Sequence, residues 1–484
     1  MVEGRVNSSS SAKIAVEEEL TLGIHELDKL LRESLTRGSL LVVAGHPGSG
    51  KTTLASTICY YNALRGRRCL YVSFIEHRDK LYANMRKLGL DLEKIEKEGL
   101  FVFMKLPLMV KAESVNHVLN AISEGVAKHN PGVVVVDSIT PLLKAAEGEL
   151  EARAILQNFF AELPRLISGL VVLLAETLLN AGRVELGDLE FVADVVLVLK
   201  YRAENGLLAR YLEIRKARGS AVNVAELPFS IVDGRGIVVY EPVVIEEIPA
   251  TREGVIVLPC KALREAIGPI RRGEVVYVTY PPDARPVMIF PLILAIAVKN
   301  GAKVLFMSYK SSPEDIKLHT ENKLVGMGLS GEAARRLIES RLVLKSLNAT
   351  SVSPTQLNLL ELKIVMEHRP DLVVFHGVDI PAAITDHLSW RVNLLNKLLY
   401  LKKNGVTVVR MGSYDDDYNY NASLADIVVK LAVVEKSGRI EHKAYVWRRG
   451  ATMPAILGEQ ALGECIVEVK DVLSKALPEQ RRAE

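Results

Sequence analysis

The chain has 484 residues, of which 49% are hydrophobic and 25% are charged, and it carries a formal net charge of +3. This length is too great for one ordinary hydrophobic core and predicts two or three domains. A net charge so close to zero excludes the broadly basic surface that attracts nucleic acid or anionic membranes. The longest apolar stretch, Pro286 to Val298, is shorter than the roughly 20 residues of a membrane-spanning helix, so we expect a buried core helix and no membrane partner.

The cysteines Cys59, Cys69, Cys260 and Cys465 lie far apart and show no metal-binding spacing. They predict reduced thiols in a cytoplasmic protein. Residues 1–15 contain a serine run and lack the apolar segment of a signal peptide, so we expect a flexible N-terminus there.

Short β-branched runs alternate with helical patterns along the chain. Apolar runs without polar alternation predict strands that are covered on both faces. In the first half these runs are Leu40–Ala44, Cys69–Phe74, Val133–Asp137, Val171–Ala175 and Val195–Leu199. Strands that alternate with helices predict a mostly parallel, doubly wound α/β sheet.

A glycine-rich segment follows the first of these strands and precedes a helix, in the pattern G-x-x-x-x-G-K-[ST]. It reads Gly45, His46, Pro47, Gly48, Ser49, Gly50, Lys51, Thr52, Thr53. Its glycines let backbone N–H groups turn inward around phosphate oxygens, and the helix dipole adds to the attraction. We expect Lys51 to reach the β- and γ-phosphates, Thr52 to ligate Mg²⁺ and Thr53 to contact the α-phosphate. The alternative is a glycine turn with an incidental lysine.

Two carboxylates and two cations complete the candidate site. Asp137 ends a buried strand, where it faces the ligand crevice and would orient Mg²⁺ as a Walker B aspartate; a structural cap is the alternative. Glu76 follows a strand end and is the candidate for activating water, or else a solvated cap. Lys216 and Arg218 alternate on a predicted strand, so both point to one face and suit the γ-phosphate of a neighbouring subunit. Ordinary surface cations are the alternative for that pair.

The sequence repeats itself, with five segments recurring in the same order. The paired segments begin at Thr36 and Arg271, at Cys69 and Val304, at His129 and His368, at Phe191 and Ser423, and at Arg215 and Val446. This pattern predicts a tandem duplication joined near Glu241 to Gly254. The domains would be residues 16–243 and 244–484.

The second copy has lost the residues of the candidate site. The positions of the loop lysine and threonine hold Pro286 and Val287, and proline lacks the N–H that a phosphate cradle requires. The position of the metal-binding aspartate holds His376, which we interpret as a satisfied core or crevice histidine; a catalytic histidine is the alternative. Trp447 replaces the first cation of the strand pair, and Arg449 persists at the second. We predict a degenerate domain that keeps the fold without the chemistry.

Several landmarks together resemble one known family. They are Leu22-Gly-Ile-His-Glu-Leu-Asp, Arg37-Gly-Ser, Ser73-Phe-Ile-Glu, Asn84-Met-Arg-Lys-Leu-Gly, Val136-Asp-Ser, Glu190-Phe-Val-Ala-Asp, Lys216-Ala-Arg-Gly and Pro228-Phe-Ser-Ile. In these the chain resembles the KaiC-like branch of the RecA superfamily of ATPases, as a double-domain member over almost its whole length. The resemblance implies a hexameric ring with ATP between subunits, in which Lys216 and Arg218 reach the nucleotide of the next protomer. A head-to-tail interface that closes makes such a ring.

The chain departs from that family at its catalytic acid. Where the family usually has Phe-Glu-Glu, this chain has Phe74-Ile75-Glu76, so Ile75 takes the place of the usual water-activating residue. Either Glu76 substitutes for it or hydrolysis is slow. Near the end of the fourth strand the family tends to have Thr-Thr-Glu, and here Glu176 stands one position earlier as a candidate compensating carboxylate.

The leading hypothesis is a P-loop ATPase that binds Mg-ATP in its N-terminal domain and acts as a regulatory or scaffold oligomer with slow hydrolysis. Its second domain would build a ring layer or dock a protein partner. The runner-up is a non-hydrolysing ATP sensor. A DNA-dependent recombinase or helicase is disfavoured, because Leu178 to Asp188, where DNA-contacting loops would lie, carries one cation, Arg183. An autokinase is disfavoured because the second domain lacks an intact site.

Overall fold

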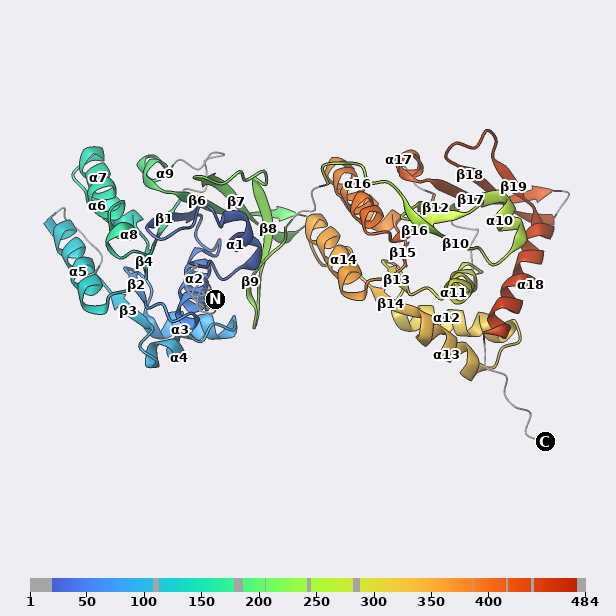
Figure 1. Ribbon diagram of the computed structural model, residues 1–484, viewed down its shortest axis with the longest axis horizontal. Coiled ribbons are helices and arrows are strands. Elements are labelled where there is room, and N and C mark those ends of the chain that lie inside the picture. Colours follow the sequence, from blue (N-terminus) through green and yellow to red (C-terminus); the bar gives the residue numbers. More distant parts are fainter. Residues whose placement is uncertain are drawn as a thin grey trace, which may run out of the picture. The chain divides into compact units, whose positions relative to one another are not determined.

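The structure is a computed structural model that describes residues 20–107, 113–177, 186–204, 206–241, 245–281, 288–385, 387–414, 417–436 and 439–476. The chain divides into two compact units, Met1–Pro242 and Val243–Glu484 (Figure 1). The predicted flexible N-terminus, residues 178–185 of the stretch considered for DNA contacts, and residues 282–287 of the second copy lie outside the described residues.

The first unit is built on one sheet, which has nine strands in the described part of the chain. Their order across the sheet is β3-β2-β4-β5-β1-β6-β7-β8-β9. The first six strands in this order are parallel to one another, and β7, β8 and β9 are added antiparallel, each to the strand before it. The strands are β1 (Ser39–Gly45), β2 (Cys69–Ser73), β3 (Phe101–Lys105), β4 (Val133–Asp137), β5 (Leu170–Glu176), β6 (Val195–Glu204), β7 (Leu207–Ala217), β8 (Glu226–Val232) and β9 (Gly236–Val239). The helices are α1 (His25–Leu31), α2 (Lys51–Leu64), α3 (Arg78–Lys87), α4 (Leu92–Lys97), α5 (Glu113–His129), α6 (Thr140–Ala145), α7 (Glu149–Ile155), the π-helix η1 (Leu156–Phe160), α8 (Leu163–Leu166) and α9 (Asp188–Val192).

Strand β1 is buried along its whole length because helices cover both faces of the sheet. Leu41 and Val43 point into a core shared with α2, and Leu40 and Val42 point into a core shared with α5 and η1. All five predicted strands are present, and the predicted doubly wound α/β fold is confirmed. The prediction missed β3 and the antiparallel strands β8 and β9. The strand expected at Lys216 and Arg218 is β7, which contains Lys216 and ends at Ala217, before Arg218.

The second unit repeats this plan with an eight-stranded sheet among the described residues, in the order β14-β13-β15-β16-β12-β17-β18-β19. Its strands are β12 (Val275–Tyr280), β13 (Val304–Ser308), β14 (Leu342–Ser346), β15 (Leu372–His376), β16 (Thr407–Ser413), β17 (Ile427–Lys436), β18 (Arg439–Arg448) and β19 (Ala455–Leu457), and β10 (Arg252–Ile256) pairs separately with β11 (Ile270–Arg272). The helices are α10 (Lys261–Ile267), α11 (Ile289–Asn300), α12 (Pro313–Gly326), α13 (Gly331–Arg341), α14 (Pro354–His368), α15 (Asp379–Ile384), α16 (His387–Lys403), α17 (Tyr418–Leu424) and α18 (Glu459–Lys475).

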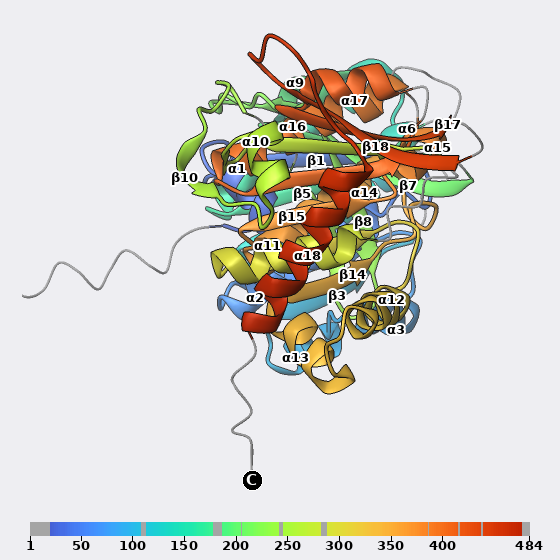
Figure 2. The ribbon, with the colours of Figure 1, turned by 90° about the vertical axis from the view of Figure 1, so that its right-hand side faces the viewer.

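The two sheets have the same strand order from β3 to β8 and from β14 to β19, as a duplication predicts. A shared aspartate anchor fixes the correspondence residue by residue. Asp194 Oδ2 accepts the N–H of Leu40 at 2.9 Å, and Asp426 Oδ2 accepts the N–H of Val275 at 2.9 Å. The first unit continues into β9, whereas the second continues from β19 into α18, which runs beside α10 and α11 (Figure 2). The apolar stretch predicted as a core helix contributes α11.

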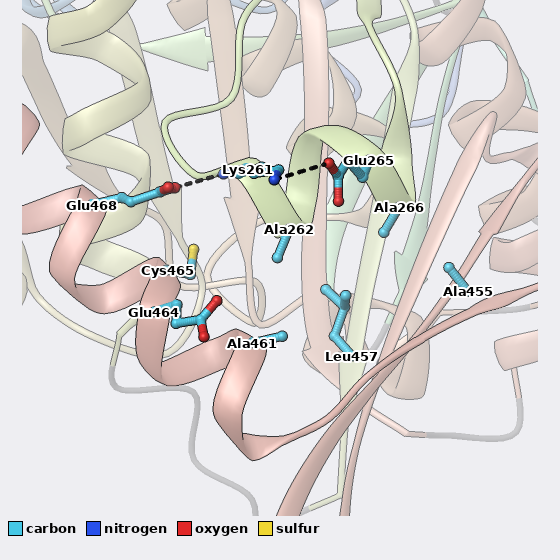
Figure 3. Close-up of a pocket in the computed structure, with 10 residues that line it drawn as sticks. All are labelled: Lys261, Ala262, Glu265, Ala266, Ala455, Leu457, Ala461, Glu464, Cys465 and Glu468. Carbon is cyan, nitrogen blue, oxygen red and sulfur yellow. Dashed lines mark hydrogen bonds and ion pairs between the residues drawn. The ribbon is translucent and has the colours of Figure 1, made fainter.

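The cysteines are paired, so the prediction of reduced thiols was wrong. Cys59 in α2 is bonded to Cys69 at the start of β2, and Cys260 before α10 is bonded to Cys465 in α18. The second bond joins residues that are 205 positions apart in the sequence. Figure 3 shows its surroundings, a cleft of about 440 Å³ between α10 and α18 where the Lys261 N–H also donates to Glu468. Within the described ranges, no helix combines the length and apolarity that crossing a membrane requires.

Candidate nucleotide-binding site

The glycine-rich loop joins β1 directly to α2, and its glycines are required by the local geometry. Gly45 has φ +155°, and a Cβ there would lie 2.4 Å from the Leu199 carbonyl oxygen. Gly50 caps α2 in a left-handed conformation with φ +108°. Since side chains rarely adopt either conformation, the loop can turn its backbone at the start of α2 only with glycine at these positions. The result is a tight cradle in front of a helix N-terminus.

Lys51 reaches back over this loop. Its Nζ donates to the carbonyl oxygens of Gly45 and His46 at 2.8 and 2.9 Å. Burial lowers the pKa of Lys51, and the negative charges of Glu176 and Asp137 oppose that shift. The ammonium group is therefore held at the mouth of the cradle.

Thr52 and Asp137 meet across the crevice. Thr52 Oγ1 donates to Asp137 Oδ2 at 3.0 Å, and the hydroxyl of Tyr71, on the neighbouring strand β2, donates to the same oxygen at 2.7 Å. Burial raises the pKa of Asp137; the two hydrogen bonds and the charge of Lys51 lower it, and Glu76 raises it. A partly desolvated carboxylate beside a threonine hydroxyl is a donor set that suits Mg²⁺.

Glu76 and Ile75 differ in their surroundings. The side chain of Ile75 is 52% exposed. The Glu76 backbone is fixed, because its N–H donates to Ser73 Oγ at 3.0 Å and its carbonyl oxygen accepts from Lys105 Nζ at 3.0 Å. Ser73 pairs with Asp137 at the ends of β2 and β4, so Glu76, whose N–H is bound to the Ser73 side chain, lies at the same end of the sheet as the crevice.

Glu176 ends β5 directly beside the loop, since its Cα pairs with that of Gly45. Its charge acts on Lys51 more strongly than that of Asp137 does. Its N–H donates to Thr140 Oγ1 at 2.8 Å. Thr177, which follows, donates its N–H to the Gly45 carbonyl oxygen at 3.2 Å. The structure therefore brings together the loop, Asp137, Glu76 and Glu176.

Lys216 and Arg218 lie away from this group. Lys216 pairs with Val196 of β6, and the Arg218 N–H donates to the Asp194 carbonyl oxygen, at the start of β6. The phosphate loop follows the other end of the neighbouring strand β1, where Gly45 pairs with Leu199. The two cations are thus displaced from the loop of their own chain toward the amino ends of the central strands.

Both cations have partners in their own chain. Lys216 Nζ donates to the carbonyl oxygens of Glu190 and Phe191 at 2.6 and 3.3 Å, and Arg218 pairs with Asp194 at 3.3 Å. The second unit has the equivalent pair, Arg449 with Asp426, at 3.6 Å.

The side chains and backbone groups around the glycine-rich loop suit the binding of Mg-ATP. The buried Oγ of Ser49 has no hydrogen-bond partner among the described residues, although it lies in the loop itself. Such an orphaned hydroxyl suits a phosphate oxygen. The N-terminus of α2 supplies unsatisfied N–H groups and a favourable dipole, and Lys51 supplies a cation. Thr52 and Asp137 supply the metal-binding oxygens.

The corresponding crevice of the second unit has a different character. His376 ends β15 and is buried, and its Nδ1 lies 3.0 Å from Ser308 Oγ. Burial lowers the pKa of His376 to about 4, with the charge of Lys310 acting in the same direction and that of Asp379 opposing it. His376 is thus buried and hydrogen-bonded through one ring nitrogen, as expected of a core or crevice histidine.

Sequence reasoning missed Tyr71. It occupies the middle of β2 and reads as an ordinary apolar strand residue, fully buried between Leu70 and Val72. The available signal was alternation, because Tyr71 and Ser73 share a face and Ser73 pairs with Asp137.

The sequence of this chain is similar to those of several known proteins. Residues 20–244 match the sequence model of the KaiC ATPase family. Circadian clock protein KaiC3 of Synechocystis sp. is 23% identical over 464 residues, which cover 91% of this chain and 88% of that protein. Circadian clock oscillator protein KaiC of Parathermosynechococcus lividus is 26% identical over 208 residues, 41% of this chain and 36% of the relative. A UPF0273 protein of Thermotoga maritima is 25% identical over 238 residues, 45% of this chain and 94% of the relative.

Proposed function

From the premise that the chain is a KaiC-like ATPase of the RecA superfamily, we propose that its first unit binds Mg-ATP and that the chain acts as a regulatory or scaffold oligomer with slow hydrolysis. The observation that carries the proposal is the convergence of Lys51, Thr52 and Asp137 on one crevice at the end of β1. The second unit holds His376 at the aspartate position, which supports one nucleotide for each chain.

We assign each residue of the site to a different part of the bound Mg-ATP. The loop from Gly45 to Gly50 would bind phosphate oxygens through backbone N–H groups, and Lys51 would turn from the loop carbonyls to the β- and γ-phosphates. Thr53 would contact the α-phosphate. Thr52 and Asp137 would hold Mg²⁺, which when bound neutralises charge on the β- and γ-phosphates. Tyr71 would keep Asp137 oriented.

Fast hydrolysis requires a side chain that orients the attacking water, and in this site the candidates are carboxylates. Glu76 is the first candidate, because it follows the end of β2 beside Asp137 and its backbone is fixed by Ser73 and Lys105. Glu176 is the second, because it lies beside the loop and its charge acts on Lys51. The exposed Ile75 cannot orient water, so we infer that turnover is slow.

The remaining cations support an oligomer. Lys216 and Arg218 lie away from the loop of their own chain, and this position supports a role at the nucleotide of a neighbouring chain. Repeating this head-to-tail contact closes a ring, which we propose to be a hexamer in keeping with the resemblance to the KaiC-like branch. The arrangement requires Lys216 and Arg218 to exchange the partners of the isolated chain for phosphate oxygens.

ATPase assays of the wild type, Lys51→Ala and Glu76→Gln, with and without single-stranded DNA, test this function. We expect slow turnover that Lys51→Ala abolishes and that DNA changes by less than a few fold. Strong stimulation by DNA would favour the recombinase class instead. Mass determination with and without Mg-ATP tests the ring, and a monomer in both states would exclude it.

A non-hydrolysing ATP sensor is the second candidate, and Ile75 is the observation that favours it. With an exposed aliphatic side chain where a carboxylate is usual, nucleotide binding alone would order the oligomer. Wild-type turnover equal to that of Lys51→Ala, together with retained ATP binding, would establish the sensor.

A further inference from the structure

The second unit contains a cavity of about 520 Å³ within its core. The cavity lies between the sheet and three helices, and its walls include Leu263 of α10, Ile293 of α11 and Val469 of α18. Native cores are close-packed and keep few voids larger than a water molecule. Natural ligand pockets, in contrast, have volumes of about 300 to 1,000 Å³. The size of this cavity is therefore that of a binding site.

Three positions of the cavity wall carry a smaller side chain than the first unit does. The aspartate anchors and the neighbouring strand pairs give the correspondence between the two sheets. With the first-unit residue named first, the pairs are Leu41 and Val276, Leu170 and Thr407, and Leu197 and Val429. All three leucines are fully buried in the core that the first sheet shares with α2. One wall position changes the other way, since Leu372 corresponds to Val133.

A change of secondary structure removes a further side chain from this space. In the first unit, β8 continues two residues beyond Leu227 to Phe229, which is fully buried in the same core. Leu457 of β19 corresponds to Leu227 in the strand pairing. Two residues beyond Leu457, however, the chain has Glu459 and begins α18. An exposed glutamate thus stands where the first unit buries a phenyl ring, and Glu459 lines the cavity.

The cavity has a buried end and an exposed end. Leu372 and Thr407, at the starts of β15 and β16, are buried. His442 of β18 and Glu459 and Gly463 of α18 also line the cavity and are exposed. We call the place where these three residues meet solvent the mouth.

Polar side chains are confined to the mouth, with one exception. His442, Lys443 and Glu459 are at the exposed end. Thr407 is the polar residue of the buried end, and its hydroxyl oxygen already accepts the Gly273 N–H at 3.3 Å. The interior therefore offers a ligand apolar contacts, and only the mouth can contact a polar group.

The interior is formed mainly by isoleucine, leucine and valine. Among the described residues that line the cavity, none is Phe, Tyr or Trp. Branched aliphatic walls give dispersion contacts to a flexible hydrocarbon chain and offer no ring that could stack on an aromatic ligand. We propose that the cavity binds the hydrocarbon chain of a single-chain lipid, with the polar head of the lipid at the mouth. The proposal concerns the second unit alone and does not rest on the proposed nucleotide function of the first.

Filling the mouth tests the site. Gly463 is a helical residue of α18, and a Cβ built on it meets no other side chain or element within 4 Å. Gly463→Leu should therefore place its side chain in the mouth without a clash. Gly326→Leu is the matched control, because Gly326 is in α12, has the same free space at its Cβ and does not line the cavity. Leucine favours a helix more than glycine does, so both variants should fold, and circular dichroism checks this.

Titration with cis-parinaric acid, a fatty acid whose fluorescence rises in apolar surroundings, is the main measurement. We expect wild type and Gly326→Leu to bind one probe for each chain, and Gly463→Leu to bind it at least about tenfold more weakly. Unlabelled saturated fatty acids below their critical micelle concentrations should displace the probe, with an affinity that rises about tenfold for every two methylene groups. A wild type that does not bind the probe saturably, equal binding by Gly463→Leu, or displacement independent of chain length would overturn the proposal.

A second variant fills the interior with the side chains of the first unit. Val276→Leu combined with Val429→Leu reduces the cavity at two wall positions. Because cavity filling generally stabilises a fold, we expect the Tm of this variant to be no lower than that of wild type and its affinity for the probe to be at least about tenfold weaker. Wild-type affinity in this folded variant would place the bound lipid outside the cavity and would overturn the proposal.

Discussion

Thr52 Oγ1 and Asp137 Oδ2 are joined by a 3.0 Å hydrogen bond that links the first turn of α2 to the end of β4. The bond places the two metal-binding oxygens of the proposed site side by side, on elements 85 positions apart in the sequence. The hydroxyl of Tyr71 donates a second hydrogen bond to the same carboxylate oxygen.

Asp137→Asn should therefore weaken the Mg²⁺ dependence of ATP binding. An amide keeps the shape of the side chain and loses its charge, and we expect affinity at saturating Mg²⁺ to fall by about 10- to 100-fold. Titration of a fluorescent ATP analogue at several Mg²⁺ concentrations measures this. Asp79→Asn, an exposed aspartate in α3, is the control. Identical Mg²⁺ dependence in wild type and Asp137→Asn would remove this residue from the metal site.

Substitutions of the carboxylates near the crevice should change the rate of ATP hydrolysis without changing the affinity for ATP. Glu76→Gln should retain ATP affinity and lower turnover by about 100-fold, the usual contribution of a positioned base. Ile75→Glu should raise turnover, because it restores a carboxylate beside the crevice. Single-turnover assays of released phosphate check both. Retained turnover in Glu76→Gln, with a loss in Glu176→Gln, would transfer the role to Glu176.

The second unit should lose stability in acid through His376. The folded pKa of about 4 lies below the ordinary value of 6.5, so between these pH values the unfolded state binds more protons. Stability therefore rises with pH through this window, and acidification from pH 6.5 to 4 should cost about 3 kcal/mol. Urea unfolding followed by tryptophan emission reports this unit, because Trp390 and Trp447 both belong to it. His376→Gln should flatten the dependence between pH 6.5 and 4, and an unchanged slope in that variant would assign the effect to other groups.

The two disulfides should stabilise their units unequally. Cys260 and Cys465 close a loop of 205 positions, whereas Cys59 and Cys69 close one of 10. In the chain-entropy account, these loops correspond to about 5 and about 3 kcal/mol of restricted unfolded chain. Thermal unfolding of Cys465→Ala and Cys59→Ala measures the difference. Alkylation of four thiols in the native, unreduced protein would show that neither bond forms.

The central strands and the phosphate loop could be predicted from the sequence alone. The edge strands and the contacts between elements could not. Strands such as Val133–Asp137 are buried on both faces and are read from apolar runs alone. Strand β3 was missed because it lies at the edge of the sheet, and only Phe101 of its residues is fully covered.

Contacts between elements were harder to predict than the elements themselves. The Cys59–Cys69 pairing depends on how α2 packs against the start of β2, and spacing alone argued against it. The hydrogen bond from Tyr71 to Asp137 depends on the register of β2 and β4.

The central claim is that one unit binds a triphosphate and its twin does not. Equilibrium dialysis of radiolabelled ATP with Mg²⁺ against the full chain and Lys51→Ala measures it most directly. We expect one nucleotide for each wild-type chain and none for Lys51→Ala. Two nucleotides for each chain, or binding that survives Lys51→Ala, would contradict the account.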